Sequence, residues 1–221
     1  MARNYFAAGG TGSGSVATMR RSLVVLAVVL STGCGSKMPL PRDLDAHAME
    51  LSISGPHTAL EAGPFLVRGF RDVPEKEADT VLGVAKARAD RTFSFQLSRS
   101  GETLREVACR AYRRTTNEAG LTAESAALAC VIGTAGGNSY GALQLADASR
   151  GSLRLGAETF VVAPDAQGLG TLVRRGDASL AAWQYTTPRT AWIATTADAE
   201  LQASLVSAMA ACIVYREFLK S

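Results

Sequence analysis

The feature that most restricts the fold is a stretch of eleven residues near the C-terminus, Leu205–Tyr215, that carries no charge. It lies within the segment 198–220, which has no glycine or proline, and Thr196 or Asp198 is placed to cap the first turn of a helix there. A helix that is apolar on every side must be buried on every side or lie in a membrane. Because eleven uncharged residues are too few to cross a bilayer, we expect a helix over about 198–220 that is enclosed by, or pressed against, the rest of the domain.

Upstream of this helix, short strand-like runs recur at intervals of roughly ten residues. Phe93–Leu97 alternates apolar and polar residues, which is typical of a half-buried strand. After a glycine-rich turn over 133–138, the runs 141–145 and 152–155 also alternate, and further strand-like runs follow at 158–162, 170–174, 180–185 and 192–194. We therefore expect a single domain over 49–221 of the mainly β (α+β) class, an antiparallel β-barrel or sandwich with a buried C-terminal helix. The charged stretch 75–79 is expected to be a solvated loop, and 113–124 a polar connection between two strands.

Near the other end of the chain, two arginines precede eight apolar residues, Leu23–Leu30, which are followed by small residues and Cys34. A membrane-spanning helix needs about 20 apolar residues, whereas eight is a typical length for the apolar region of a signal peptide. The run resembles a bacterial lipoprotein signal peptide with its lipobox, although Ser31 stands where leucine is commonest. The resemblance implies a diacylglyceryl thioether on Cys34, cleavage after Gly33 and acylation of the new amino terminus.

The same resemblance divides the chain into segments. Residues 19–33 are expected to be the signal peptide, 34–48 the lipid anchor and its tether, and 1–18 a mis-assigned extension upstream of a second methionine. Gly35, rather than aspartate, follows the anchor cysteine, which in lipoproteins of a Gram-negative envelope directs the protein to the periplasmic face of the outer membrane. The alternative is an ordinary secretory signal that is cleaved nearby, with Cys34 as an incidental thiol.

Export would place the remaining cysteines in an oxidising compartment. Cys109 and Cys130 lie 21 residues apart in strand-like runs and would face each other on the core side if those strands pair antiparallel. In an oxidising compartment they are expected to form a disulfide. The alternative is two reduced cysteines that pack as small apolar residues. Cys212 lies in the apolar C-terminal segment and is expected to be buried and inert.

The expected architecture resembles that of the tubby-like and phospholipid-scramblase-like proteins, in which a β-barrel encloses a hydrophobic C-terminal helix. The resemblance covers about residues 49–220. It is one of architecture without a shared residue motif, so it transfers no functional residue. It implies a barrel and suggests lipid binding as an alternative function, whereas a generic β-sandwich with a packed helix is the alternative fold.

One short motif raises the question of hydrolase activity. Gly137–Gly141 matches the G-x-S-x-G pattern of a nucleophile elbow, which needs a strand before Ser139 and a helix after it. The residues that follow alternate like a strand, and no histidine follows Ser139, so a turn explains the motif and no catalytic residue is assigned. His47 and His57 stand apart without the spacing of paired metal ligands, so neither a metal site nor a cofactor is expected.

Arg110, Arg113 and Arg114, with Tyr112 among them, form either a small anion-binding patch or the protective charges of an exposed strand edge. The net charge of +3, without a dense lysine and arginine cluster, does not favour nucleic-acid binding. We expect an exported protein held at the membrane by a lipid on Cys34, whose domain is a non-catalytic binding or structural module with an envelope protein or a lipid as partner. The alternatives are a lipid-handling protein with a tubby-like barrel and a serine hydrolase that uses the serine of the elbow-like motif.

Overall fold

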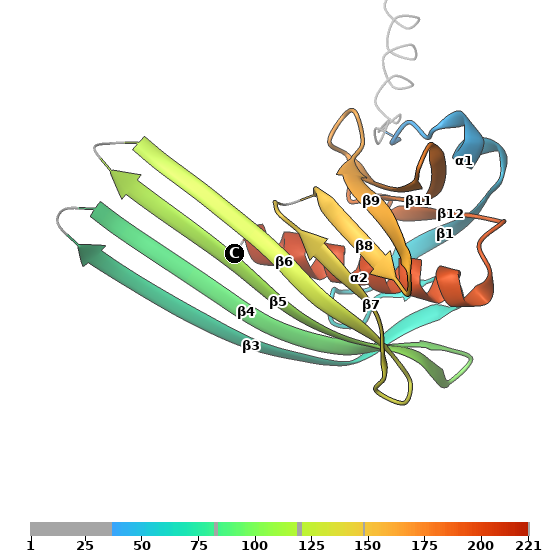
Figure 1. Cartoon of the computed structure of the whole chain (residues 1–221), viewed down its shortest axis with the longest axis horizontal. Coiled ribbons are helices and arrows are strands. Elements are labelled where there is room, and N and C mark those ends of the chain that lie inside the picture. Colours follow the sequence, from blue (N-terminus) through green and yellow to red (C-terminus); the bar gives the residue numbers. More distant parts are fainter. Residues whose placement is uncertain (1–36, 82–83, 119–120, 148, 221) are drawn as a thin grey trace, which may run out of the picture. The chain divides into compact units, whose positions relative to one another are not determined.

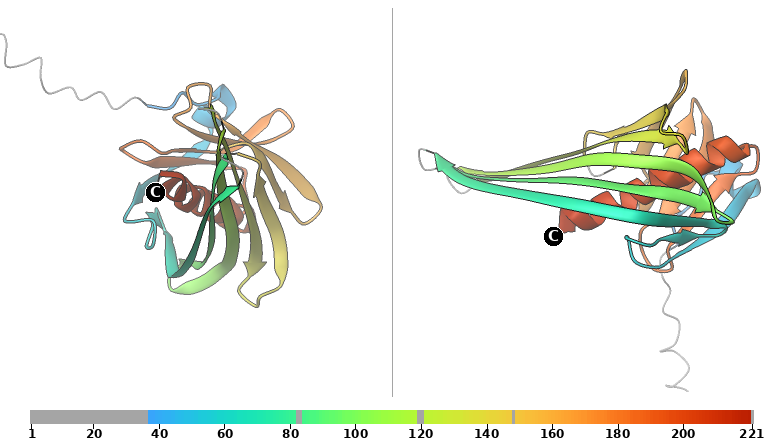
Figure 2. Two further views of the ribbon diagram at one scale, coloured as in Figure 1. Left: turned by 90° about the vertical axis from the view of Figure 1, so that its left-hand side faces the viewer. Right: turned by 90° about the horizontal axis from the view of Figure 1, so that it is seen from below.

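The computed structural model describes residues 37–81, 84–118, 121–147 and 149–220. Within these ranges, antiparallel strands form a closed barrel in the order β1-β12-β11-β10-β9-β8-β7-β6-β5-β4-β3-β2. One long helix, α2, lies inside the barrel wall (Figure 2). The expected mainly β fold with a buried C-terminal helix is therefore confirmed, and the barrel holds rather than the sandwich.

The elements follow one another with short connections. The helices are α1, Arg42–Ala46, and α2, Ala199–Lys220. The first six strands are β1 (Ala48–Ser54), β2 (Glu61–Ala62), β3 (Phe65–Val81), β4 (Val84–Arg99), β5 (Glu102–Glu118) and β6 (Leu121–Thr134). The last six are β7 (Ser139–Leu145), β8 (Gly151–Leu155), β9 (Glu158–Pro164), β10 (Gly170–Arg175), β11 (Ala178–Gln184) and β12 (Thr190–Ala194).

Helix α2 supplies the centre of the core. Asp198 caps it, since its Oδ1 accepts a hydrogen bond from the Leu201 backbone N–H at 2.8 Å. Every residue from Ala203 to Tyr215 is buried, as a helix without a polar face requires. The two buried serines in this range are satisfied inside the helix, because Ser204 and Ser207 each donate to the carbonyl four residues earlier at 2.9 Å. Within the described ranges, neither helix has the length and apolar character needed to span a membrane.

Strands β3 to β6 are much longer than the others, with 14 to 17 residues against 5 to 7 in β7–β12. They continue past the short strands as a four-stranded sheet (Figure 1). The expectation of loops at 75–79 and 113–124 is wrong, because the first range belongs to β3 and most of the second to the β5–β6 hairpin. Residues 122–125 are all exposed. A strand alternates apolar and polar residues only where one face is buried, so this part of the sheet has no apolar alternation to detect.

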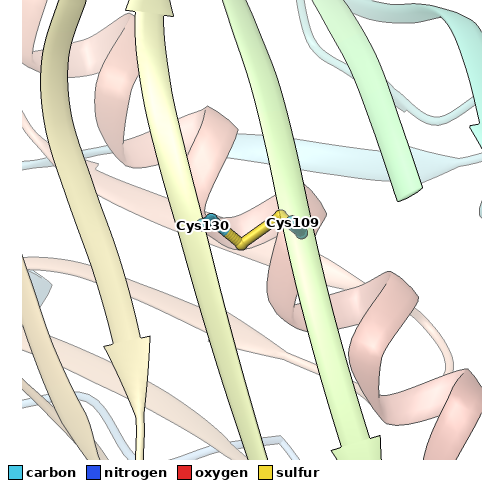
Figure 3. Close-up of a disulfide and its surroundings, with 2 residues drawn as sticks. All are labelled: Cys109 and Cys130. Atoms are coloured by element: carbon cyan, nitrogen blue, oxygen red, sulfur yellow. A yellow bond between two sulfur atoms is a disulfide. The ribbon is translucent and has the colours of Figure 1, made fainter. Parts of the chain in front are cut away.

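The predicted disulfide is present and joins β5 to β6 (Figure 3). Cys109 and Cys130 lie directly opposite each other in the antiparallel register, with an S–S distance of 2.11 Å and a Cα–Cα distance of 4.0 Å. Cys212 is buried and free, and burial raises the pKa of its thiol to about 12. The cysteines of the described chain thus separate into a structural pair and an inert core thiol.

Met38 and the short helix α1, which precede β1, pack on the barrel. Met38 is buried, and its backbone N–H donates to Oε1 of Gln184 at 2.8 Å. In α1, Leu44 is fully buried and Oδ2 of Asp43 accepts from the Ser179 backbone N–H at 2.7 Å, which lowers the pKa of Asp43. Part of the predicted tether therefore belongs to the folded domain. Cys34 itself lies outside the described residues, and its lipidation remains a prediction.

Candidate functional site

A polar cluster occupies the outer face of β4 and β5. Strand residues alternate between the two faces of a sheet, so Cys109, which faces the core, leaves Arg110, Tyr112 and Arg114 on the outer face of β5. On β4, Asp90 lies opposite Tyr112 in the register. The fold thus gathers side chains from two strands onto one stretch of outer surface.

Asp90 is at the centre of this cluster. Its carboxylate accepts hydrogen bonds from Nε and Nη2 of Arg88 at 3.0 and 2.6 Å, and from Nη2 of Arg110 at 3.0 Å. The Asp90 side chain is 7% exposed, against 65% for Arg110. The hydrogen bond from Arg88 is the main cause that holds the pKa of Asp90 below its usual value, in opposition to burial, and Arg110 adds to it. One buried carboxylate therefore fixes two guanidinium groups at the surface.

The cluster forms one wall of a groove of about 650 Å³, which we call the arginine groove. Small side chains of β6, including Ala127 and Ala129, line its middle, and Gln144 of β7 and Ser152 of β8 line its other side. Its full lining is Arg88, Asp90, Arg110, Tyr112, Arg114, Ala127, Leu128, Ala129, Gln144, Leu145, Ala146, Gly151 and Ser152. Among these side chains three guanidinium groups stand against one carboxylate, so the groove carries a surplus of positive charge.

The groove lies where β6 separates from its neighbour. Strand β7 pairs with β6 from Leu128 to Gly133 only, while β6 continues to Leu121. The Tyr215 hydroxyl of α2 is buried and has no hydrogen-bond partner among the described residues. Burial, and then the nearby Asp147 and Tyr112, raise the pKa of Tyr215. An unpartnered buried hydroxyl is unusual in a folded protein.

The structure keeps three of the four predicted patch residues together. Arg110, Tyr112 and Arg114 line the groove, and the guanidinium of Arg114 lies 5.6 Å from the centre of the Tyr112 ring. Arg113 points to the opposite face, where its Nη1 donates to the Leu219 carbonyl at 2.8 Å. Arg88 and Asp90 were not identified from the sequence. They are two residues apart and come just before the strand-like run at 93–97, so a strand that began earlier would place both side chains on one face.

The remaining candidates do not form a second site. Ser139 is the exposed first residue of β7, so a strand follows it rather than the helix of a nucleophile elbow. Across the described part of the chain, no group of three or more histidine, cysteine or acidic side chains is placed to hold a metal ion.

Comparisons of this chain with models of protein families, with curated proteins and with solved structures found no match in any of the three.

Proposed function

We propose that this protein is a non-catalytic binding module of a bacterial cell envelope, held at the membrane by a lipid on Cys34. In this proposal the arginine groove binds negatively charged groups of a ligand or partner. The observation that carries the binding role is the pair of arginines that Asp90 fixes at the rim of a 650 Å³ groove. The proposed location of the domain, on the periplasmic face of the outer membrane, rests on the lipoprotein signal alone.

The arginines are suited to binding anions. A guanidinium group has five N–H donors in a planar fork that matches a carboxylate or a phosphate. Within the described contacts, Arg110 donates only through Nη2, so its other donors remain for a ligand. Since Asp90 already holds Arg88 and Arg110 in place, binding loses less side-chain entropy than it would with mobile arginines.

The alternative functions need features elsewhere in the molecule. A tubby-like barrel that handles lipid would have to bind it outside the barrel centre, because α2 is buried there along 203–215. A serine hydrolase using Ser139 would need a base, and no histidine follows that residue in the chain. The arginine groove therefore supports the binding role better than either alternative.

The groove is tested by titrating the full-length protein with inorganic pyrophosphate and with citrate at low ionic strength in a calorimeter. We expect Arg110→Gln to weaken binding about tenfold, since a charge-assisted hydrogen bond contributes roughly 1.5 kcal/mol. Arg154→Gln is the matched control, because Arg154 is exposed on β8 and does not line the groove. Equal weakening in both variants, or no binding to the wild type, would contradict the proposed site.

The anchor is tested separately by the intact mass of the protein recovered from membranes of a bacterial host. We expect a chain that begins at Cys34 and carries acyl groups, and we expect Cys34→Ser to yield a soluble or unprocessed product. A soluble, unacylated wild-type protein would remove the membrane tether from the proposal and leave the groove as a secreted binding site.

A further inference from the structure

Strand β6 has a free edge beside the arginine groove. Beyond Leu128, no strand of the described chain pairs with β6 on the side of β7, so its residues 121–127 pair with β5 alone. Unpaired backbone groups on a sheet edge are a template for another strand. The groove and the free edge meet at Ala127, which belongs to both.

The disulfide identifies which backbone groups face outward along this edge. In an antiparallel pair, residues about 4.5 Å apart at Cα are not hydrogen-bonded to each other, and residues about 5.5 Å apart are. Cys109 and Cys130, at 4.0 Å, are therefore a non-hydrogen-bonded pair. The two kinds of pair alternate along the strand, so every second residue of β6 from Cys130 is in a non-hydrogen-bonded pair. Ala126, Glu124 and Thr122 are among these residues. Their N–H and C=O groups point away from β5, toward the free edge.

The edge carries little of the usual protection, since Glu124 is the one charged residue in 121–127. Proline and lysine on an edge strand discourage the addition of another strand. Strand β3, at the other side of the long sheet, carries Pro74 and Lys76, whereas residues 121–127 of β6 contain neither. The β6 edge is thus open to an additional strand in a way that β3 is not.

Charge indicates which kind of strand would add. On the outer face, Arg114 lies opposite Ser125 and Tyr112 opposite Ala127. Ser125 is small, so the long Arg114 side chain of β5 can reach across it toward a strand placed one spacing further, about 4.8 Å from β6. A strand at that position would bring an outward side chain near Arg114, which favours glutamate or aspartate there. Arg110 is not within its reach, because Arg110 is held by Asp90 of β4 and lies opposite Ala129, where β6 already pairs with β7.

We propose that an extended, acidic segment of a partner protein adds to β6 as a strand along residues 122–126. Its main chain pairs with the outward N–H and C=O groups of Thr122, Glu124 and Ala126, and an acidic side chain opposite Ser125 contacts Arg114. Such β-strand addition derives affinity from the main chain and specificity from alternate side chains. This inference rests on the proposed binding role of the arginine groove and names the partner of that site.

The probe is a fluorescein-labelled peptide, Thr-Glu-Val-Glu-Thr-Glu-Val, with a counterpart in which lysine replaces every glutamate. Both are titrated against the full-length protein in detergent, and hydrogen exchange is followed by mass spectrometry of fragments that cover 121–127. We expect the acidic peptide to bind, the lysine peptide not to bind, and up to three amides of this segment to exchange more slowly in the complex.

Two variants at one position separate backbone pairing from charge. Ala126→Pro removes an outward N–H without removing a β5 hydrogen bond, and we expect it to weaken peptide binding at least tenfold. Ala126→Ser keeps the N–H and should bind like the wild type. Pyrophosphate binding should be equal in both variants, which also shows that each is folded.

The following outcomes would overturn the inference. Peptide binding without slower exchange at 121–127, or without an effect of Ala126→Pro, would mean that the groove attracts acidic groups and β6 adds no strand. Slow hydrogen exchange at 121–127 in the absence of peptide, together with a dimer in sedimentation, would mean that a second copy of this chain pairs with the edge. Binding of pyrophosphate with no binding of the acidic peptide would leave the proposed function standing, whereas binding of neither would remove both.

Discussion

Arg105 on β5 donates from Nε to Oγ of Ser204 on α2 at 3.2 Å, so that a buried cation joins the barrel wall to the helix. The Arg105 side chain is 3% exposed and lies 4.6 Å from the centre of the Tyr140 ring. Its Nη2 also contacts the carboxylate of Glu200 and donates to the Glu200 carbonyl at 3.1 Å. Glu200 thus supplies the negative charge that Arg105 needs inside the wall.

This arrangement predicts an asymmetry between two substitutions. Glu200→Ala leaves the Arg105 charge buried with neutral acceptors only, and we expect it to lower the free energy of unfolding by about 2 kcal/mol, less than for a fully buried pair because Glu200 is largely exposed. Arg105→Met removes the charge and fills most of the space, so we expect a change within about 1 kcal/mol. Denaturant titrations of the full-length variants measure both values. A larger loss in Arg105→Met than in Glu200→Ala would contradict this account.

A second prediction concerns the bond between β5 and β6. The disulfide closes a chain segment of 21 residues, and a loop of this size stabilises a protein by about 3 kcal/mol in the chain-entropy model. We expect a phosphine reductant to lower the free energy of unfolding of the wild type by about this amount. The double variant Cys109→Ala with Cys130→Ala should not respond to the reductant. An equal response in both proteins would show that the reductant acts elsewhere.

The fold could be predicted wherever a strand or helix buries one side against the core. The strands of 141–162 alternate, the helix around Leu205–Tyr215 is uncharged, and Cys109 and Cys130 fall on the core side of paired strands, so each left a pattern in the sequence. The far halves of the long hairpins left none, because residues such as Thr122 and Glu124 are exposed. Polarity alone does not distinguish a solvated strand from a loop.

The candidate site was only partly predictable for a different reason. The alternation of Arg110, Tyr112 and Arg114 was visible, and the same alternation already separates Arg113 onto the other face. The contact of Arg110 with Asp90 depends on the register of β4 against β5 and on two side chains that are 20 residues apart. Register is set by the whole barrel, so no local pattern contains it.

A third prediction follows from the burial of Cys212. Its thiol has a pKa of about 12, so the thiolate fraction at pH 8 is very small, and its sulfur is inside the core. We expect no labelling of the Cys212 peptide by iodoacetamide in the native protein over hours, and complete labelling in guanidinium chloride. Mass spectrometry of the digested protein measures both. Rapid native labelling would mean that α2 leaves the barrel on the time scale of the experiment.

The last prediction concerns pH and the carboxylate at the centre of the arginine groove. The pKa of Asp90 is lowered in the folded protein, chiefly by the hydrogen bond from Arg88. A lowered folded-state pKa contributes stability that is present above the unfolded-state value, about 3.9, and is lost as the pH falls through the folded-state value. We therefore expect Asp90→Asn to destabilise the protein at pH 7, and the difference from the wild type to shrink below about pH 4. Free energies of unfolding measured between pH 7 and pH 2.5 test this. Asp177→Asn, at an exposed position outside the groove, is the control. If the difference in free energy of unfolding between Asp90→Asn and the wild type stays constant across this range, the ion pairs do not stabilise the fold.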